Sequence, residues 1–259
     1  MDATVAAAAF GLTDPCIPLP GGAGTSVRCG ACVLKPDHEP REARFVQETM
    51  EALDPGAAPV RVPRVRRAPD GRTVVDGWIA TEFIPDLREL RPDWAAIVGA
   101  GRRFHALLRE IRPGTELAGR THRWAVADRV AWDESDVALP SDAARVDGRL
   151  RHLCREVDEP PQLIHADLTG NVLVDPDGMP VVIDFSPYVR PASFATAVVV
   201  ADALLWEGAD LDVIDLLGTD PLPMLARALR FRLVAEQLAI DPRHGAAVGN
   251  YAALLDALT

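Results

Sequence analysis

The sequence lacks an apolar run long enough to cross a membrane. The longest one in its C-terminal half, Phe194 to Leu205, is interrupted by Thr196 and Asp202, whereas a membrane-spanning helix needs about 20 consecutive apolar residues. Residues 3–10 are also apolar, but they follow Asp2 and no basic segment precedes them, unlike a secretory signal peptide. We therefore expect a cytoplasmic protein that does not have the membrane as a partner.

Basic residues are also scarce relative to acidic ones. The chain has 27 Lys and Arg against 38 Asp and Glu, which gives a formal net charge of −11 at pH 7. Non-specific binding to nucleic acid needs a basic surface, so we expect no nucleic-acid partner. The negative charge is compatible with a cationic substrate, although net charge serves solubility before any specific function.

Cysteines are few, and their spacing offers little for metal or redox chemistry. Cys29 and Cys32 form a C-x-x-C motif, but a second such pair and a matching pair of histidines are missing, which argues against a structural zinc site. A thioredoxin-like motif would lie at a helix N-terminus. Here the motif lies between a glycine-rich segment and the short strand predicted at residues 32–35, so a redox function is disfavoured.

Segments with strand character come first in the chain. At 259 residues, with 48% hydrophobic and 25% charged residues, the protein can bury a core as one domain or two lobes. A β-hairpin with a glycine-rich connection is predicted over residues 10–35, and an amphipathic helix over 39–53. Two further strands are predicted at 60–67 and 72–83, joined by a turn at 69–71.

Helices dominate the rest of the chain. They are predicted at 93–111, with Asp93 as N-cap, around 124–132, at 141–157, and from 192 to the end. Short strands at 172–174 and 181–183 form one more hairpin. Strands first and helices after indicate an α+β fold. We place the boundary at Pro85-Asp86, which divides the chain into residues 1–85 and 86–259.

The most informative stretch is IHADLTGN at residues 164–171, followed by VVID at 181–184. A loop between apolar segments displays the Asp167 carboxylate and the Asn171 amide, and a hairpin returns a second carboxylate, Asp184. Oxygen ligands of this kind suit Mg²⁺, and a carboxylate that is not bound to metal can accept a hydroxyl proton. The alternative is structural, with Asp167 and Asn171 capping turns and Asp184 ending a strand.

This stretch resembles the catalytic loop and metal-binding segment of the aminoglycoside phosphotransferase family, relatives of the protein kinases. Residues 184–191 and 200–206 further resemble an actinobacterial branch of that superfamily. The resemblance implies a two-lobed protein-kinase-like fold with a small β-rich N-terminal lobe and a helical C-terminal lobe. It also implies that Asp167 is the catalytic base, that Asn171 and Asp184 bind Mg²⁺, and that His105 and His165 are structural.

The same resemblance assigns a nucleotide-binding role to the N-terminal lobe. The glycine-rich segment at residues 20–26 would cover the phosphates of ATP. Lys35 would pair with the phosphates, and Glu42 would orient Lys35, with Glu48 as the alternative. The segment around Glu82 and Ile84 would be the interlobe hinge that holds the adenine. The expected cofactor-binding residues are Gly22, Gly24, Thr25, Ser26, Lys35, Glu42, Glu82 and Ile84.

The function implied is an ATP- and Mg²⁺-dependent phosphotransferase that acts on a hydroxyl of a small molecule, such as an aminoglycoside or amino sugar. One alternative is a nucleotide-binding pseudokinase with a regulatory role, because Asp167 and Asn171 are one residue closer than is usual in the family. A kinase for a larger partner is a third, disfavoured because no A-P-E segment follows.

Charged residues leave the nature of the acceptor open. Arg190 could face an anionic acceptor. Six acidic residues could form a wall that binds an amine-bearing sugar, or they could simply lie on solvated faces of the protein. They are Asp133, Glu134, Asp136, Asp202, Glu207 and Asp210.

Overall fold

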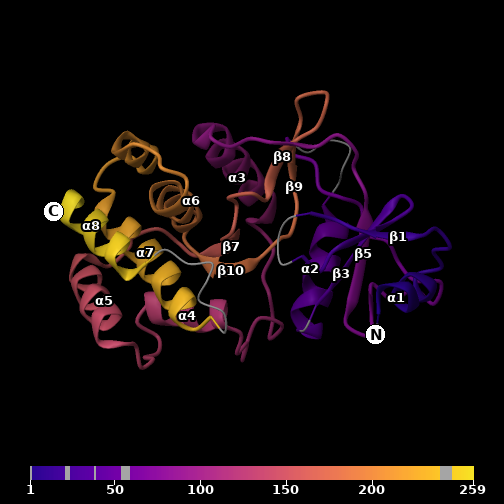
Figure 1. Cartoon of the computed structure of the whole chain (residues 1–259), viewed down its shortest axis with the longest axis horizontal. Helices are drawn as coiled ribbons and strands as arrows, with labels where there is room; N and C mark the ends of the chain where they lie inside the picture. Colours follow the sequence, from indigo (N-terminus) through magenta and orange to yellow (C-terminus); the bar gives the residue numbers. More distant parts are fainter. Residues whose placement is uncertain (1, 21–23, 38, 54–58, 240–246) are drawn as a thin grey trace.

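The computed structural model of the chain describes residues 2–20, 24–37, 39–53, 59–239 and 247–259. The N-terminal third of the chain forms a five-stranded sheet at one end of an elongated molecule, and most of the helices lie at the other end (Figure 1). The fold is therefore α+β and two-lobed, as predicted. We use N-lobe for the part built around strands β1 to β5 and C-lobe for the part from helix α3 onward.

The N-lobe is an antiparallel sheet with strand order β1-β2-β3-β5-β4. A small core lies on it, with Phe10, Leu34, Trp78 and Ala80 buried together. The strands are β1 (Cys16–Pro18), β2 (Val27–Cys29), β3 (Cys32–Pro36), β4 (Val74–Val75) and β5 (Trp78–Glu82), and the helices are α1 (Ala3–Ala9) and α2 (Pro40–Ala52). The predicted hairpin over 10–35 and the helix over 39–53 are thus confirmed.

The predicted strand at 60–67 is wrong. This segment makes only isolated bridges, from Arg61 to Val181 and from Val65 to Thr81, because Pro63 between them has no N–H to donate to a sheet.

The predicted turn at 69–71 is present: Gly71 N donates to Ala68 O at 2.9 Å and Ala68 N donates to Arg72 O at 2.8 Å. The predicted strand at 72–83 is instead divided into β4 and β5 by a second turn at Asp76 and Gly77, whose φ angles are 48° and 78°. An Asp-Gly pair with positive φ at both residues is typical of a two-residue type I′ hairpin.

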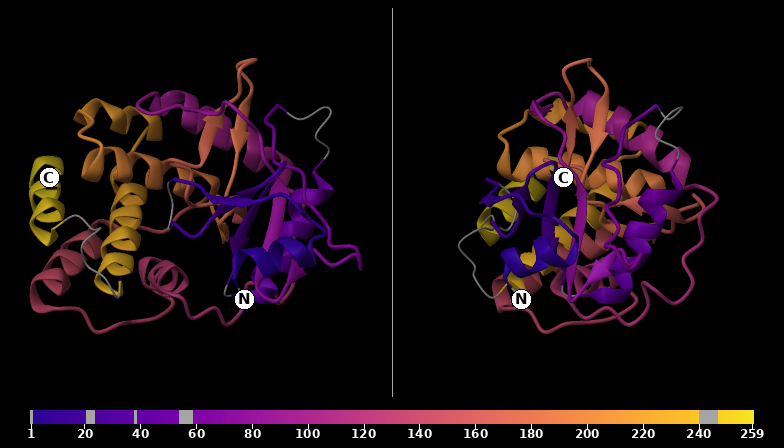
Figure 2. Two further views of the ribbon diagram at one scale, coloured as in Figure 1. Left: turned by 45° about the vertical axis from the view of Figure 1, so that its right-hand side comes forward. Right: turned by 90° about the vertical axis from the view of Figure 1, so that its right-hand side faces the viewer.

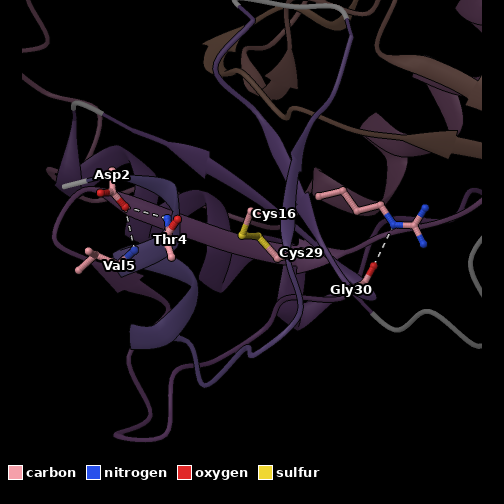
Figure 3. Close-up of a disulfide and its surroundings, with 7 residues drawn as sticks. Asp2, Thr4, Val5, Cys16, Cys29 and Gly30 are labelled. Atoms are coloured by element: carbon pink, nitrogen blue, oxygen red, sulfur yellow. Dashed lines mark hydrogen bonds between the residues drawn. A yellow bond between two sulfur atoms is a disulfide. The ribbon is translucent and has the colours of Figure 1, made fainter.

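A disulfide joins Cys16 and Cys29, which face each other across β1 and β2 (Figure 3). Cys32 is the partner of Cys29 in the next strand pair and is a free thiol. Cys29 and Cys32 are therefore not a C-x-x-C redox pair in this structure. The nearby helix α1 begins at Asp2, whose carboxylate accepts hydrogen bonds from the backbone N–H groups of Thr4 and Val5.

The C-lobe is a helical bundle around α6, which is buried along almost its whole length, and α7 packs against α4, α5 and α6. Its helices are α3 (Trp94–Leu108), α4 (Arg123–Ala131), α5 (Ser141–Leu153), α6 (Ala192–Trp206), the 3₁₀ helix η1 (Leu211–Leu217), α7 (Leu222–Gln237) and α8 (Val248–Leu258). Among the described helices, none is both long and apolar enough to cross a membrane.

Two further small sheets contain the strands on either side of the Asp167 loop. One pairs β7 with β10, and the other has the order β6-β8-β9. Figure 2 shows the β8–β9 hairpin on the side of the C-lobe that faces the N-terminal sheet. The strands are β6 (Arg88–Glu89), β7 (Gln162–His165), β8 (Val172–Val174), β9 (Pro180–Val182) and β10 (Pro187–Arg190).

The sequence predicted some of the helix ends correctly and others not. The Asp93 carboxylate accepts a hydrogen bond from Ala96 N at 2.9 Å and so caps α3, as predicted. Helix α5 begins at Ser141 but ends at Leu153, four residues before the predicted end.

The two lobes share part of one core. Phe45 and Met50 of α2 belong to the same buried cluster as the C-lobe helices, and so do Val60 and Val62 from the segment before β4. Backbone hydrogen bonds between Arg61 and the β9 region join the same parts. Helix α2 is therefore packed on the C-lobe as well as connected to the sheet.

Candidate active site

A buried histidine organises the loop that carries Asp167. The Nδ1 atom of His165, at the end of β7, accepts hydrogen bonds from Asp167 N and Ser186 N, both at 3.3 Å, and its Nε2 lies 3.2 Å from Ile183 O. Burial lowers the pKa of His165 to about 4, so the ring is neutral at pH 7. It braces three backbone segments at once and is structural, as the resemblance implied.

Helix α3 holds the same loop from the other side. His105 Nε2 accepts a hydrogen bond from His165 N at 3.1 Å, and the side chain of Leu168 lies over Gly101, where a Cβ would collide with it. A glycine at this position therefore allows the helix and the loop to approach closely.

Asn171 lies against Asp167. Its amide nitrogen donates to the Asp167 backbone oxygen at 2.8 Å and to Asp167 Oδ2 at 3.3 Å. The backbone oxygen of Asn171 accepts from Ile183 N at 2.9 Å, which places Asp184 beside it across the β8–β9 hairpin. The sequence motif therefore brings these three residues together, even though Asp167 and Asn171 are one residue closer than in the family pattern.

Lys35 reaches this cluster from the N-lobe. Its Nζ lies 2.9 Å from Asp184 Oδ2, and about two fifths of the Asp184 side chain is exposed. Asp184 has a φ of 49°, in the left-handed region that non-glycine residues seldom occupy. A lysine and a carboxylate from different lobes thus meet at the same place.

The pairing expected between Lys35 and Glu42 is not the one formed. Glu42 lies in the first turn of α2 and pairs instead with Arg120 Nη1 at 3.1 Å and His122 Nε2 at 3.4 Å. Burial alone would raise the pKa of Glu42, but hydrogen bonds and charge from His122 and Arg120 lower it overall. Glu48, the alternative partner, is exposed. In this structure α2 thus directs Glu42 toward the C-lobe.

The expected nucleotide-binding residues Gly24, Thr25 and Ser26 directly precede β2. Gly24 has a φ of 70° and open space where a Cβ would be. Thr25 is exposed, and Ser26 O accepts a backbone hydrogen bond from Leu19. Gly22 lies outside the described residues.

At the predicted hinge, the side chain of Glu82 is already engaged. Arg61 Nη2 donates to Glu82 Oε1 at 2.7 Å. Ile84 is buried, with 7% of its surface exposed. Any contact of this segment with an adenine would therefore be made by its backbone rather than by the Glu82 carboxylate.

The acidic residues considered as an acceptor wall are mostly paired with arginines. Asp210 is exposed. Arg190, considered for an anionic acceptor, is itself bound by Asp128 and Glu134. The remaining pairs are Asp133 with Arg151 and Arg230, Asp136 with Arg151, Asp202 with Arg232, and Glu207 with Arg91.

Sequence reasoning missed one residue of the site, Arg232 of α7, which forms an ion pair with Asp167 Oδ1 at 2.7 Å. The available signal was an arginine within the mainly apolar stretch FRLVA at residues 231–235. A charge in such a stretch is buried only when it has partners, but the sequence does not say which partners these are.

The residues of this site fit a Mg²⁺ ion that would take most of its ligands from the phosphate oxygens of a substrate and from water. Asn171 donates with its amide nitrogen, which leaves the amide oxygen as the atom that would bind a cation, and Asp184 offers a partly exposed carboxylate. Within the described part of the chain, no group of three or more His, Cys, Asp or Glu could hold a metal. Mg²⁺ needs no such cage, because phosphate and water oxygens complete its shell.

Solved structures share this fold across the whole chain. An amicoumacin kinase matches with a TM-score of 0.65 and 15% identity, covering 98% of this chain and 90% of that one. A choline/ethanolamine kinase family protein from Mesorhizobium loti matches with 0.60 and 18%, covering 100% and 95%. An aminoglycoside phosphotransferase from Alicyclobacillus acidocaldarius matches with 0.60 and 16%, covering 97% and 94%.

Sequence comparison identifies the family directly. No curated protein gives a significant match. The sequence profile described as "Phosphotransferase enzyme family" matches residues 28–189, which is more than half of the chain. The match runs from β2 through the Asp167 loop and the β8–β9 hairpin to β10. The chain therefore belongs to the phosphotransferase enzyme family, as the resemblance of its catalytic loop predicted.

Proposed function

We propose that this phosphotransferase is a small-molecule kinase that uses ATP and Mg²⁺ and transfers the γ-phosphoryl group to a hydroxyl. The observation that carries the proposal is the meeting of Lys35 from the N-lobe with Asp184 of the C-lobe, next to Asn171 and Asp167. Nucleotide use is supported by two similar structures, the amicoumacin kinase with AMP-PNP and Ca²⁺ and a spectinomycin phosphotransferase with AMP.

In the proposed reaction, the acceptor hydroxyl oxygen attacks the γ-phosphorus of ATP. The bond between that phosphorus and the β–γ bridging oxygen breaks, ADP leaves, and Asp167 accepts the hydroxyl proton. Lys35 pairs with the phosphates, and Asn171 and Asp184 hold Mg²⁺, which neutralises phosphate charge when it is bound. Residues 1–85 would supply the nucleotide site and residues 86–259 the catalytic and acceptor site.

We propose a neutral or weakly charged hydroxyl compound as the acceptor in preference to a polycationic aminoglycoside. Five of the six carboxylates considered for a cationic acceptor already pair with arginines. Ammonium groups bound there would compete with those pairs, and for the buried Arg230 and Arg232 the loss of a carboxylate partner is costly. Amino sugars with one amine stay within the proposal.

The test of cofactor use is a thermal-shift experiment with ATP, with and without Mg²⁺, on the wild type and on Asp184→Ala. We expect MgATP to raise the melting temperature of the wild type more than ATP alone, because a ligand that binds only the folded state stabilises it by mass action. Asp184→Ala should lose the metal-dependent part and keep the metal-free part, since the substitution also releases Lys35 for the phosphates.

Asp177→Ala is the matched control, because Asp177 is exposed in the turn of the same hairpin and should respond to MgATP as the wild type does. Equal binding of ATP with and without Mg²⁺ in both the wild type and Asp184→Ala, measured by calorimetry, would exclude Asp184 as a metal ligand. Transfer is then assayed over polyols, amino sugars and aminoglycosides. Tight MgATP binding without transfer to any acceptor would favour the pseudokinase alternative.

A further inference from the structure

A buried arginine from a distant helix contacts the proposed catalytic carboxylate. Arg232 lies in α7, and only 4% of its side chain is exposed. Its Nη2 donates to Asp167 Oδ1 at 2.7 Å, across 65 residues of sequence. About two fifths of the Asp167 side chain remains exposed, so the contact does not close the carboxylate off from an acceptor.

The guanidinium of Arg232 is itself held in place by Asp202 of α6. Nε donates to Asp202 Oδ1 at 2.7 Å and Nη2 to Oδ2 at 2.6 Å. Such a two-point contact fixes the plane of the guanidinium. Burial alone would lower the pKa of Arg232, but the carboxylates of Asp202 and Asp167 raise it above its ordinary value. Arg232 is therefore a fixed positive charge.

Aromatic rings enclose the same guanidinium. Its Cζ lies 5.2 Å from the ring centroid of Trp124 and 5.7 Å from that of Trp206. Both distances are within the range of cation–π attraction. Arg232 is thus held by Asp202 of α6 and lies over two tryptophan rings, and neither kind of contact involves Asp167.

Asp167 needs such a fixed partner. The terminal torsion of an aspartate is broad, so a partly exposed carboxylate rotates unless its oxygens are held. Asn171 reaches Oδ2 at 3.3 Å, which is long, whereas the Arg232 contact with Oδ1 is short and charge-assisted. A misplacement of about 1 Å at a reacting group can cost about 100-fold in rate.

We propose that Arg232, anchored by Asp202, is a positioning residue that fixes the orientation of the Asp167 carboxylate for phosphoryl transfer. The inference rests on the proposed function. It differs from a purely structural role, in which Arg232 would only join α7 to α6. A positioning role predicts that Arg232 affects turnover through Asp167, whereas a structural role predicts an effect that does not depend on Asp167.

The test is a double-mutant cycle of Arg232→Lys and Asp167→Asn, assayed with saturating MgATP. The acceptor is the compound found in the screen or, where none is found, water in ATP hydrolysis. We expect Arg232→Lys to lower kcat by up to about 100-fold, with KM and ATP affinity nearly unchanged. Asp167→Asn should lower kcat by roughly 10²–10⁴-fold, and the double variant should resemble Asp167→Asn alone.

Arg230→Lys is the matched control. Arg230 is also buried in α7 and pairs with Asp147 and Asp133 rather than Asp167, so any effect of its substitution should multiply with that of Asp167→Asn. If Arg232→Lys does not fold, Arg232→Met combined with Asp202→Asn replaces it, because removing both charges leaves no buried charge unpaired. This pair should show the same loss of kcat.

Multiplicative effects of Arg232→Lys and Asp167→Asn, or a wild-type kcat in Arg232→Lys, would overturn the positioning role and leave the proposed function intact. Absence of both transfer and hydrolysis in the wild type would overturn the proposed function, and the inference with it.

Discussion

At the scale of single residues, two buried histidines hold the loop that carries Asp167. His105 is 3% exposed and accepts a hydrogen bond from the backbone of His165 through Nε2. Burial, with a smaller contribution from His165, lowers the pKa of His105 to about 3. The neutral ring is therefore the form on which the hydrogen bond, and with it the position of the loop, depends.

These lowered pKa values predict a loss of stability in acid. A histidine in the unfolded chain binds a proton below about pH 6.5, whereas folded His105 stays neutral down to about pH 3. The unfolded state then binds more protons, so the free energy of unfolding falls as the pH drops from about 6.5 toward 3. Each such histidine adds a slope of up to about 1.4 kcal/mol per pH unit.

His105→Gln should make the free energy of unfolding depend less steeply on pH between pH 6 and pH 4, by an amount that corresponds to about one bound proton. Urea unfolding at several pH values measures this slope. Identical slopes in the wild type and His105→Gln would show that His105 is not held neutral in the folded protein.

At the scale of elements, the β1–β2 hairpin is cross-linked by a disulfide. Strands β1 and β2 have three residues each, so few hydrogen bonds hold them together. The Cys16–Cys29 bond closes the connection between them, over a sequence separation of 13. Cytoplasmic thiols are kept reduced, so this bond and the cytoplasmic location expected from the sequence point in opposite directions.

Cys16→Ser should therefore lower the free energy of unfolding by about 3 kcal/mol, the value typical of a loop of this size. Cys154→Ser, which removes a free thiol, is the control for substitution of a cysteine. Cells lysed directly into an alkylating reagent and denatured should yield two labelled cysteines per chain. Four labelled cysteines would show that the protein is reduced where it is made, and would support the cytoplasmic prediction.

At the scale of the whole molecule, the two lobes differ greatly in how much core they contain. The core of the N-lobe sheet is small, whereas the C-lobe core extends through α3, α6 and α7. Helix α2 lies between β3 and β4 of the N-lobe sheet in sequence, yet Phe45 and Met50 belong to the C-lobe core. The Glu42–Arg120 ion pair adds a polar contact to the same interface.

We expect this distribution to appear in native-state hydrogen exchange, because regions with little buried apolar contact open at lower free energy. The amides of α6 and α7 should exchange most slowly and those of β1 to β5 fastest, with α2 following the C-lobe rather than the sheet. MgATP should slow exchange in β1 to β3. Exchange of α2 together with the sheet would contradict the packing of this helix on the C-lobe core.

The sequence by itself determined the fold class and indicated the proposed site at the Asp167 loop, and it did so through local signals. Asp167, Asn171 and Asp184 lie within one loop and the hairpin that follows, so their separation along the chain nearly fixes their separation in space. The cap at Asp93 is equally local, and even the missed turn at Asp76-Gly77 was encoded by two adjacent residues.

Only the tertiary structure decided which charged and sulfur groups pair across long stretches of chain. Glu42 had possible partners in several segments, and its pairing with Arg120 follows from how α2 packs on the C-lobe. Arg232 meets Asp167 because α7 packs on α6, and α6 packs on β7, the strand that leads into the Asp167 loop. Ion pairs and disulfides form wherever the core brings suitable groups within reach. No local pattern in the sequence encodes that distance.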